Sequence, residues 1–170
     1  MLTTRQLTVL FEYNLWADRR VLEACGALDA EQFTRALGSS FESVRDTVAH
    51  VYGAEWLWNE RFQGRRPTRL PSPELFPDLA SVRAGLEAMD RYYIEMVSGM
   101  TADDLARVIE YTNLAGESCA DPVGQILHQL SNHATYHRGQ IVTMLRQLGA
   151  KGVSTDLIRF YHEQTDRAPE

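Results

Sequence analysis

The chain has 170 residues, of which 44% are hydrophobic and 24% charged, and its formal net charge at pH 7 is −6. This length and composition exclude a disordered or fibrous protein and favour a single domain over residues 1–170 with a core of its own. Basic residues gather only at Arg65, Arg66 and Arg69, so we expect no extended basic surface for nucleic acid.

The N-terminal sequence MLTTRQLTVLFEYNLW has a polar residue every few positions and no long apolar run. We therefore expect no signal peptide and no membrane span, and a cytoplasmic protein. The two cysteines, Cys25 and Cys119, are too few for a disulfide framework, which fits a reducing compartment. From about Arg5 to Leu28, apolar residues at three-and-four spacing predict the first long helix.

The next elements follow from capping and breaking residues. Asp29 and Gln32 form a capping-box pattern that predicts a short helical turn, and residues 41–62 carry an apolar stripe that predicts the second long helix from Phe41 to Phe62. Residues 64–78 contain four prolines, which deny a regular helix and predict a long crossover loop along the bundle.

The second half repeats this organisation. Apolar residues at strict three-and-four spacing predict a third long helix from Leu79 to Met100, and residues 101–120 predict a capped turn and a short extended hairpin. Asp121 and Pro122 are expected to open a helix that Gly149 closes, and Ser154 to cap a short final helix. The predicted fold is all-α: a four-helix bundle with a long crossover loop and a short C-terminal helix.

Two histidines on the fourth long helix form a candidate ligand pair. His133 and His137 are four residues apart, which places them about 40° apart around the helix axis and about 6 Å apart along it. Both interrupt a line of apolar residues that faces the core, where imidazole nitrogens need partners. A shared metal ion would satisfy both rings, and a pair of hydrogen-bonded structural histidines is the alternative.

The other histidines on the long helices are less clear from periodicity. His128 lies on the opposite face of its helix, near Ser131, Thr135 and Arg138, and we interpret that face as exposed to solvent. His50 lies about 120° from the main apolar stripe of the second helix, beside a weaker apolar face. Spacing alone leaves open whether His50 points into the bundle.

Several segments together resemble the DinB family, also called the damage-inducible or YfiT-like bundle proteins. They are YNLWAD from Tyr13, the single His50 before GAEWLW, HATYHRGQ from His133, and the final STDLIRFYHEQ. The resemblance implies a divalent metal ion held by His50, His133 and His137. It also implies a homodimer from the bacterial cytosol, and in some members transfer of low-molecular-weight thiols such as bacillithiol.

Three imidazoles on one side of an ion leave the other side open to a small-molecule substrate. Nitrogen ligands favour a divalent transition metal, with Zn or Ni ahead of Fe, Co and Cu. One hypothesis is therefore a metal-dependent thiol S-transferase acting on small electrophiles. The alternatives are a non-catalytic, stress-associated metal-binding protein and a metal-free bundle with structural histidines.

No catalytic residue is assigned from the sequence. Asp46, one turn before His50, is the nearest candidate to orient that ring or to act as a base. Tyr13 and Trp16 suit either a pocket or the core, and Gln140 is predicted to lie on the surface.

Overall fold

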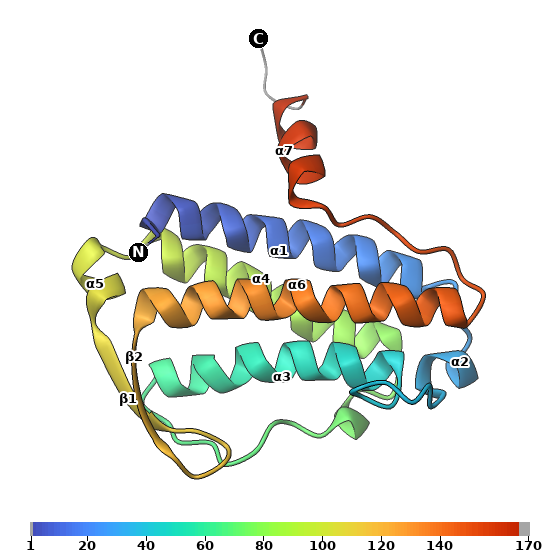
Figure 1. The fold of residues 1–170 in the computed structure, drawn as a ribbon, viewed down its shortest axis with the longest axis horizontal. Coiled ribbons are helices and arrows are strands. Elements are labelled where there is room, and N and C mark those ends of the chain that lie inside the picture. The colour runs from blue at the N-terminus through green and yellow to red at the C-terminus, as the bar shows by residue number, and fades with distance from the viewer. Residues whose placement is uncertain (1, 167–170) are drawn as a thin grey trace.

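The computed structural model describes residues 2–166, and its main body is a bundle of four long helices (Figure 1). These four helices are α1 (Thr4–Cys25), α3 (Val44–Phe62), α4 (Leu79–Ser98) and α6 (Val123–Gln147). Helices α4 and α6 each pack against both α1 and α3. The all-α bundle predicted from the apolar spacing is therefore confirmed.

Short elements connect the long helices. Helix α2 (Ala30–Thr34) follows α1 and helix α5 (Ala102–Ala106) follows α4, and both begin with a complete capping box. The crossover from α3 to α4 contains only a single 3-10 turn, Pro73–Leu75, as the four prolines predicted. Helix α7 (Leu157–Thr165) follows α6 and packs against α1.

The predicted hairpin is present as strands β1 (Val108–Thr112) and β2 (Ser118–Pro122), which pair antiparallel (Figure 1). The last long helix begins one residue later than the prediction from Asp121 and Pro122. Asp121 lies in β2, where its carboxylate accepts a hydrogen bond from the Tyr111 hydroxyl at 2.8 Å and so is not available as a cap. Pro122 occupies the N-cap position, and α6 begins at Val123.

Two other predicted helix starts also differ. Helix α3 begins at Val44 rather than Phe41, because the Ser43 side chain accepts a hydrogen bond from the Asp46 backbone N–H and caps the helix there. Phe41 therefore lies in the connection before α3. In the C-terminal segment, Asp156 rather than Ser154 is the N-cap of α7, and the Ser154 hydroxyl donates to the Asp156 carboxylate.

The bundle interior contains polar side chains as well as an apolar core. We call six of these side chains, contributed by all four long helices, the buried polar group: Asn14, Asp18, Glu55, Asp90, Ser131 and Arg138. Arg138 forms an ion pair with Asp18, with its Nη1 at 3.2 Å from each carboxylate oxygen. No helix within residues 2–166 is both long enough and apolar enough to cross a membrane.

Candidate metal centre

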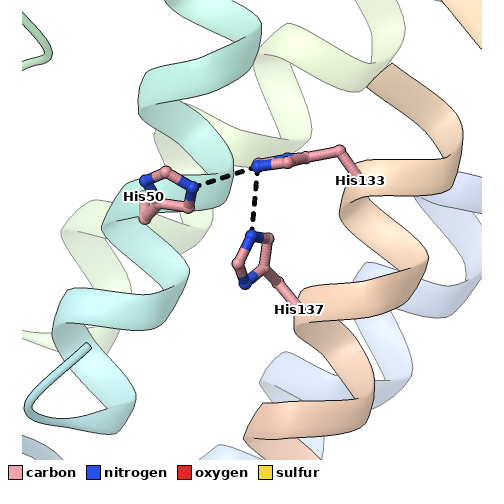
Figure 2. Close-up of side chains that lie close together, drawn as sticks. All are labelled: His50, His133 and His137. Atoms are coloured by element: carbon pink, nitrogen blue, oxygen red, sulfur yellow. Dashed lines mark hydrogen bonds between the residues drawn. The ribbon is translucent and has the colours of Figure 1, made fainter. Parts of the chain in front are cut away.

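Three histidine side chains from two adjacent helices converge on one point (Figure 2). His133 and His137 extend from α6 and His50 extends from α3. The Nε2 atom of His133 lies 3.0 Å from Nε2 of His50 and 3.0 Å from Nε2 of His137. Among the described residues, this is the one group of three or more histidine, cysteine or acidic side chains compact enough to hold a metal ion.

The nitrogen arrangement fits an ion better than it fits hydrogen bonds. An imidazole nitrogen carries either one proton or one in-plane lone pair, so Nε2 of His133 cannot serve two neighbours at 3.0 Å equally well. Nitrogens ~2.0–2.1 Å from a tetrahedral ion lie ~3.4 Å apart, somewhat further than the 3.0 Å observed for two of the three pairs, so small side-chain shifts would admit an ion. The donor set therefore suits one divalent transition-metal ion.

The protonation of the rings also suits ligation. Burial, with the charge of His137 as a second cause, lowers the pKa of His50 to about 4. Burial and the charges of His137 and His50 lower the pKa of His133 to about 4. Near neutral pH both imidazoles are therefore uncharged, which is the form that binds metals.

An aromatic ring and an amide fix the orientation of two of the histidines. Phe41 stacks on His50, with ring centroids 4.0 Å apart and an interplanar angle of 25°. The Nδ1 atom of His137 lies 2.7 Å from Oε1 of Gln140, one turn further along α6. Because the amide oxygen of Gln140 can only accept, Nδ1 carries the proton and donates it to Gln140, which leaves the lone pair of Nε2 facing the other histidines. The Gln140 amide nitrogen in turn donates to the Ser40 hydroxyl at 3.4 Å.

Other residues singled out from the sequence lie outside the centre. His128 is exposed on α6, as its helical position predicted. Asp46 forms an ion pair with Arg45 at 3.0 Å and, among the described residues, makes no hydrogen bond to His50. Tyr13 and Trp16 instead bond the C-terminal segment, through the Thr155 carbonyl and the Glu163 carboxylate respectively.

The prediction that the His128 face of α6 is exposed to solvent is only partly correct. Arg138 and Ser131, assigned there with His128, are buried, with 0% and 3% exposed surface. Arg138 reaches the interior because Asp18 on α1 supplies the opposite charge and Asn14 accepts a further hydrogen bond at 3.0 Å. Both partners are more than 100 residues away in the sequence, so helical spacing could not reveal them.

Sequence reasoning missed the two residues that orient the rings. Gln140 was predicted to lie on the surface, although a histidine and a hydrogen-bonding side chain three residues later face the same way on a helix. The three-residue spacing between His137 and Gln140 could therefore have predicted this contact. Phe41 was assigned to the apolar stripe of a helix, and no pattern in the sequence indicated that it stacks on His50.

These observations define a class: a four-helix bundle with a three-histidine group between two adjacent helices. A family model described as "DinB family" matches residues 1–168, and the chain belongs to this family. Protein DinB of Bacillus subtilis (strain 168) is 26% identical over 166 residues, which are 94% of this chain and 96% of the relative.

A solved structure gives an independent comparison of the fold. It is the crystal structure of a DinB-like protein from Bacillus cereus ATCC 10987, which matches with a TM-score of 0.62 and 16% sequence identity. The match covers 82% of this chain and 90% of the other. At this identity the likeness supports the bundle fold, and it agrees with the family assignment.

Proposed function

We propose that the protein is a metal-dependent enzyme in which His50, His133 and His137 hold one divalent transition-metal ion. The observation that carries the proposal is the position of His133 Nε2, 3.0 Å from the Nε2 atoms of both other histidines. Three nitrogen ligands suit Zn, Ni, Fe, Co or Cu more than Mg or Ca, and we propose Zn or Ni as the first candidates. A bound ion of this kind lowers the pKa of a water or thiol and makes it nucleophilic at neutral pH.

The surroundings of the centre favour access by a small molecule. His50 and His133 are only half-buried, in contrast to the enclosed ligands of a structural site. A cavity of about 370 Å³ lies beside Gln140, between α6 and residues 37–39; Gln140 lines it, and the three histidines do not. Tyr136 lines this cavity and packs edge-on against His137, with ring centroids 5.0 Å apart.

For the reaction we propose transfer of a low-molecular-weight thiol to a small electrophile. The thiol sulfur attacks an electrophilic carbon, a C–S bond forms, the bond from that carbon to its leaving group breaks, and the leaving group departs with the electron pair. The thiol proton passes to solvent. Among the described residues, no carboxylate hydrogen-bonds to the three histidines. The described residues around the centre therefore supply no evident general base for hydrolysis.

The same lack of an acid or base beside the described histidines also favours one alternative function. A non-catalytic, stress-associated protein would need the metal ligands but no proton-transfer residue. Both proposals require metal binding, and turnover separates them.

The first experiment measures metal content by elemental analysis after purification without an immobilised-metal column. We expect close to one transition-metal ion per chain in the wild type and a large loss in the His133→Ala variant. His128→Ala is the matched control, because it removes an exposed histidine from the same helix and should keep the metal. Metal well below one ion per chain in the wild type, unchanged by His133→Ala, would support a metal-free bundle.

The second experiment measures turnover of electrophiles with bacillithiol, mycothiol and glutathione, comparing metal-loaded with chelated protein. A rate that requires both a thiol and the metal supports the transferase. A metal-loaded protein that shows no metal-dependent rate with any of the three thiols would leave the non-catalytic function as the better proposal.

We further propose that the protein works in the cytoplasm as a homodimer, as the resemblance to DinB-family proteins implies. Light scattering with size-exclusion chromatography tests the assembly. A mass near twice 19.3 kDa is expected, and a mass near 19.3 kDa would contradict the dimer.

A further inference from the structure

A second cavity lies far from the histidines, at the end of the bundle that carries the hairpin. It has a volume of about 660 Å³ and lies between the end of α3, the following Gly64–Thr68 segment and strand β1. Arg61 in its wall is eleven residues after His50 on α3, about 16 Å further along the helix. None of the three histidines lines it.

The lining of this cavity is basic in a protein whose net charge is −6. Four arginines line it: Arg61, Arg65, Arg66 and Arg107. Glu60 pairs with the Arg65 guanidinium through two hydrogen bonds. Among the described residues, the other three arginines form no ion pair, and Glu110 is the one acidic residue in the lining. The cavity therefore has an excess of positive charge that no described partner neutralises.

Arg61 is held rigidly in the wall. Its side chain is nearly buried, with the residue 8% exposed, and its guanidinium lies 4.6 Å from the Trp58 ring centroid and 4.5 Å from that of Tyr111. One N–H donates to the Thr112 carbonyl at 2.8 Å. A guanidinium has five N–H donors, and no second described protein acceptor is bonded to this one. Arg61 is therefore a fixed, charged group with unused donors.

Apolar and aromatic side chains form part of the remaining wall, beside polar residues such as Thr112 and Asn113. Phe62, Val108, Ile109 and Tyr111 contribute to it beside the arginines. The volume lies within the range of about 300–1,000 Å³ that small-molecule sites occupy, and such sites combine apolar walls with a few fixed polar groups. Guanidinium groups bind carboxylates and phosphates through paired charge-assisted hydrogen bonds.

From this combination we propose that the cavity is a second ligand site, which binds an organic oxyanion: a carboxylate or phosphate carried on an apolar or aromatic body. The Arg61 donors, with Arg66 and Arg107, bind the oxyanion, and the Phe62 and Ile109 side chains contact the body of the ligand. Glu110 opposes anion binding and limits its affinity. The site does not depend on the metal centre.

The test is titration calorimetry of the full chain with four probes: phenyl phosphate, benzoate, inorganic phosphate and uncharged benzyl alcohol. We expect saturable binding of one or both organic anions, weaker binding of inorganic phosphate and none of benzyl alcohol. The stronger of phenyl phosphate and benzoate shows whether the site prefers a phosphate or a carboxylate group. Binding should weaken at high salt, because two of the contacting arginines, Arg66 and Arg107, are exposed to solvent.

Variants locate the binding. Arg66→Ala/Arg107→Ala removes two exposed charges from the lining and should weaken binding about tenfold, and Glu110→Gln should strengthen it about twofold to threefold. Arg35→Ala/Lys151→Ala removes two exposed charges elsewhere and should leave the affinity unchanged. His133→Ala should also bind the probes normally, which separates this site from the metal centre.

Four results would overturn the proposal. They are no saturable binding of either organic anion, equal binding of benzyl alcohol, equal binding of inorganic phosphate, or an affinity that the Arg66→Ala/Arg107→Ala variant does not reduce. Circular dichroism of that variant checks that a lost affinity is not a lost fold. If the variant does not fold, Glu110→Gln decides: tighter binding supports the proposal and unchanged binding overturns it.

Discussion

Gln140 accepts a hydrogen bond from His137 Nδ1 at 2.7 Å, which turns the opposite nitrogen of the ring toward His133. The acceptor is one turn away on the same helix, so the local geometry of α6 places the two side chains within reach of each other. Gln140 also donates to Ser40 in the connection before α3, and thereby links the ring to the segment that carries Phe41.

The first prediction concerns this orienting contact. Gln140→Leu should lower metal affinity about 10-fold to 100-fold, because His137 loses the acceptor that fixes its tautomer. Gln140→Glu keeps an acceptor and should retain most of the affinity. Competition with a chromogenic chelator measures both. Gln147→Leu, an exposed change two turns further on α6, is the control, and equal affinities for all variants would contradict a role for Gln140.

The second prediction concerns the ring that stacks on His50. Phe41→Ala should weaken metal binding about threefold to tenfold, because a stacked pair contributes about 0.5–1.5 kcal/mol and its loss lets the imidazole rotate. Phe41→Tyr keeps the ring and should bind as the wild type does. The same chelator competition reports the difference. An alanine variant with wild-type affinity would show that Phe41 only covers the site.

The third prediction concerns pH. Burial raises the pKa of Glu55 well above its ordinary value, with the charge of Asp18 as a second cause. Burial likewise raises the pKa of Asp90, with the charges of Asp18 and Glu55 adding to it. These carboxyls keep their protons to a higher pH in the folded protein than in the unfolded chain. The free energy of unfolding should therefore fall as pH rises above about 4–5, by up to about 1.4 kcal/mol per pH unit for each carboxyl, until the folded groups also ionise.

Asp90→Asn replaces one of these carboxyls with an amide, which does not ionise. The variant should be more stable than the wild type at pH 8, with a smaller difference at pH 4. Urea unfolding at both values measures the effect. Glu12→Gln changes an exposed carboxylate on α1 and should shift stability little at either pH. A wild type that gains stability between pH 5 and pH 8, with Asp90→Asn no more stable, would indicate that an ion or other partner holds these carboxylates ionised.

The fourth prediction concerns the buried ion pair between Asp18 and Arg138. Asp18→Ala should destabilise the fold by about 3–5 kcal/mol, because it leaves the Arg138 charge inside the bundle without its partner. The double variant Asp18→Leu/Arg138→Met removes both charges and should lose much less stability. Urea unfolding provides the measurement. A double variant at least as unstable as Asp18→Ala would mean that the pair contributes more than mutual neutralisation.

Whether a feature could be predicted from the sequence depends on how far apart in the chain the residues that determine it lie. The α4 helix begins at the predicted Leu79, and His128 points outward, because helical periodicity is a local property. Spacing placed His133 and His137 on one face, and the structure brings them together with His50. Their role as ligands stays a prediction.

Long-range contacts account for what the sequence did not predict. Arg138 is buried because of Asp18 and Asn14 on another helix, and the orientation of His50 depends on which face α3 turns toward α6. The β2 strand extends to Pro122 because it pairs with β1, which overrides the local capping signal at Asp121. Each of these outcomes depends on a partner that periodicity does not identify.

The three histidines come from two halves of the chain, and His133 follows His50 by 83 positions. An ion held by all three would therefore act as a reversible cross-link, closing a long loop much as a disulfide does without requiring an oxidising compartment. Cross-links over long loops remove conformational entropy mainly from the unfolded chain. On this basis removal of the ion would lower the free energy of unfolding as well as empty the proposed site.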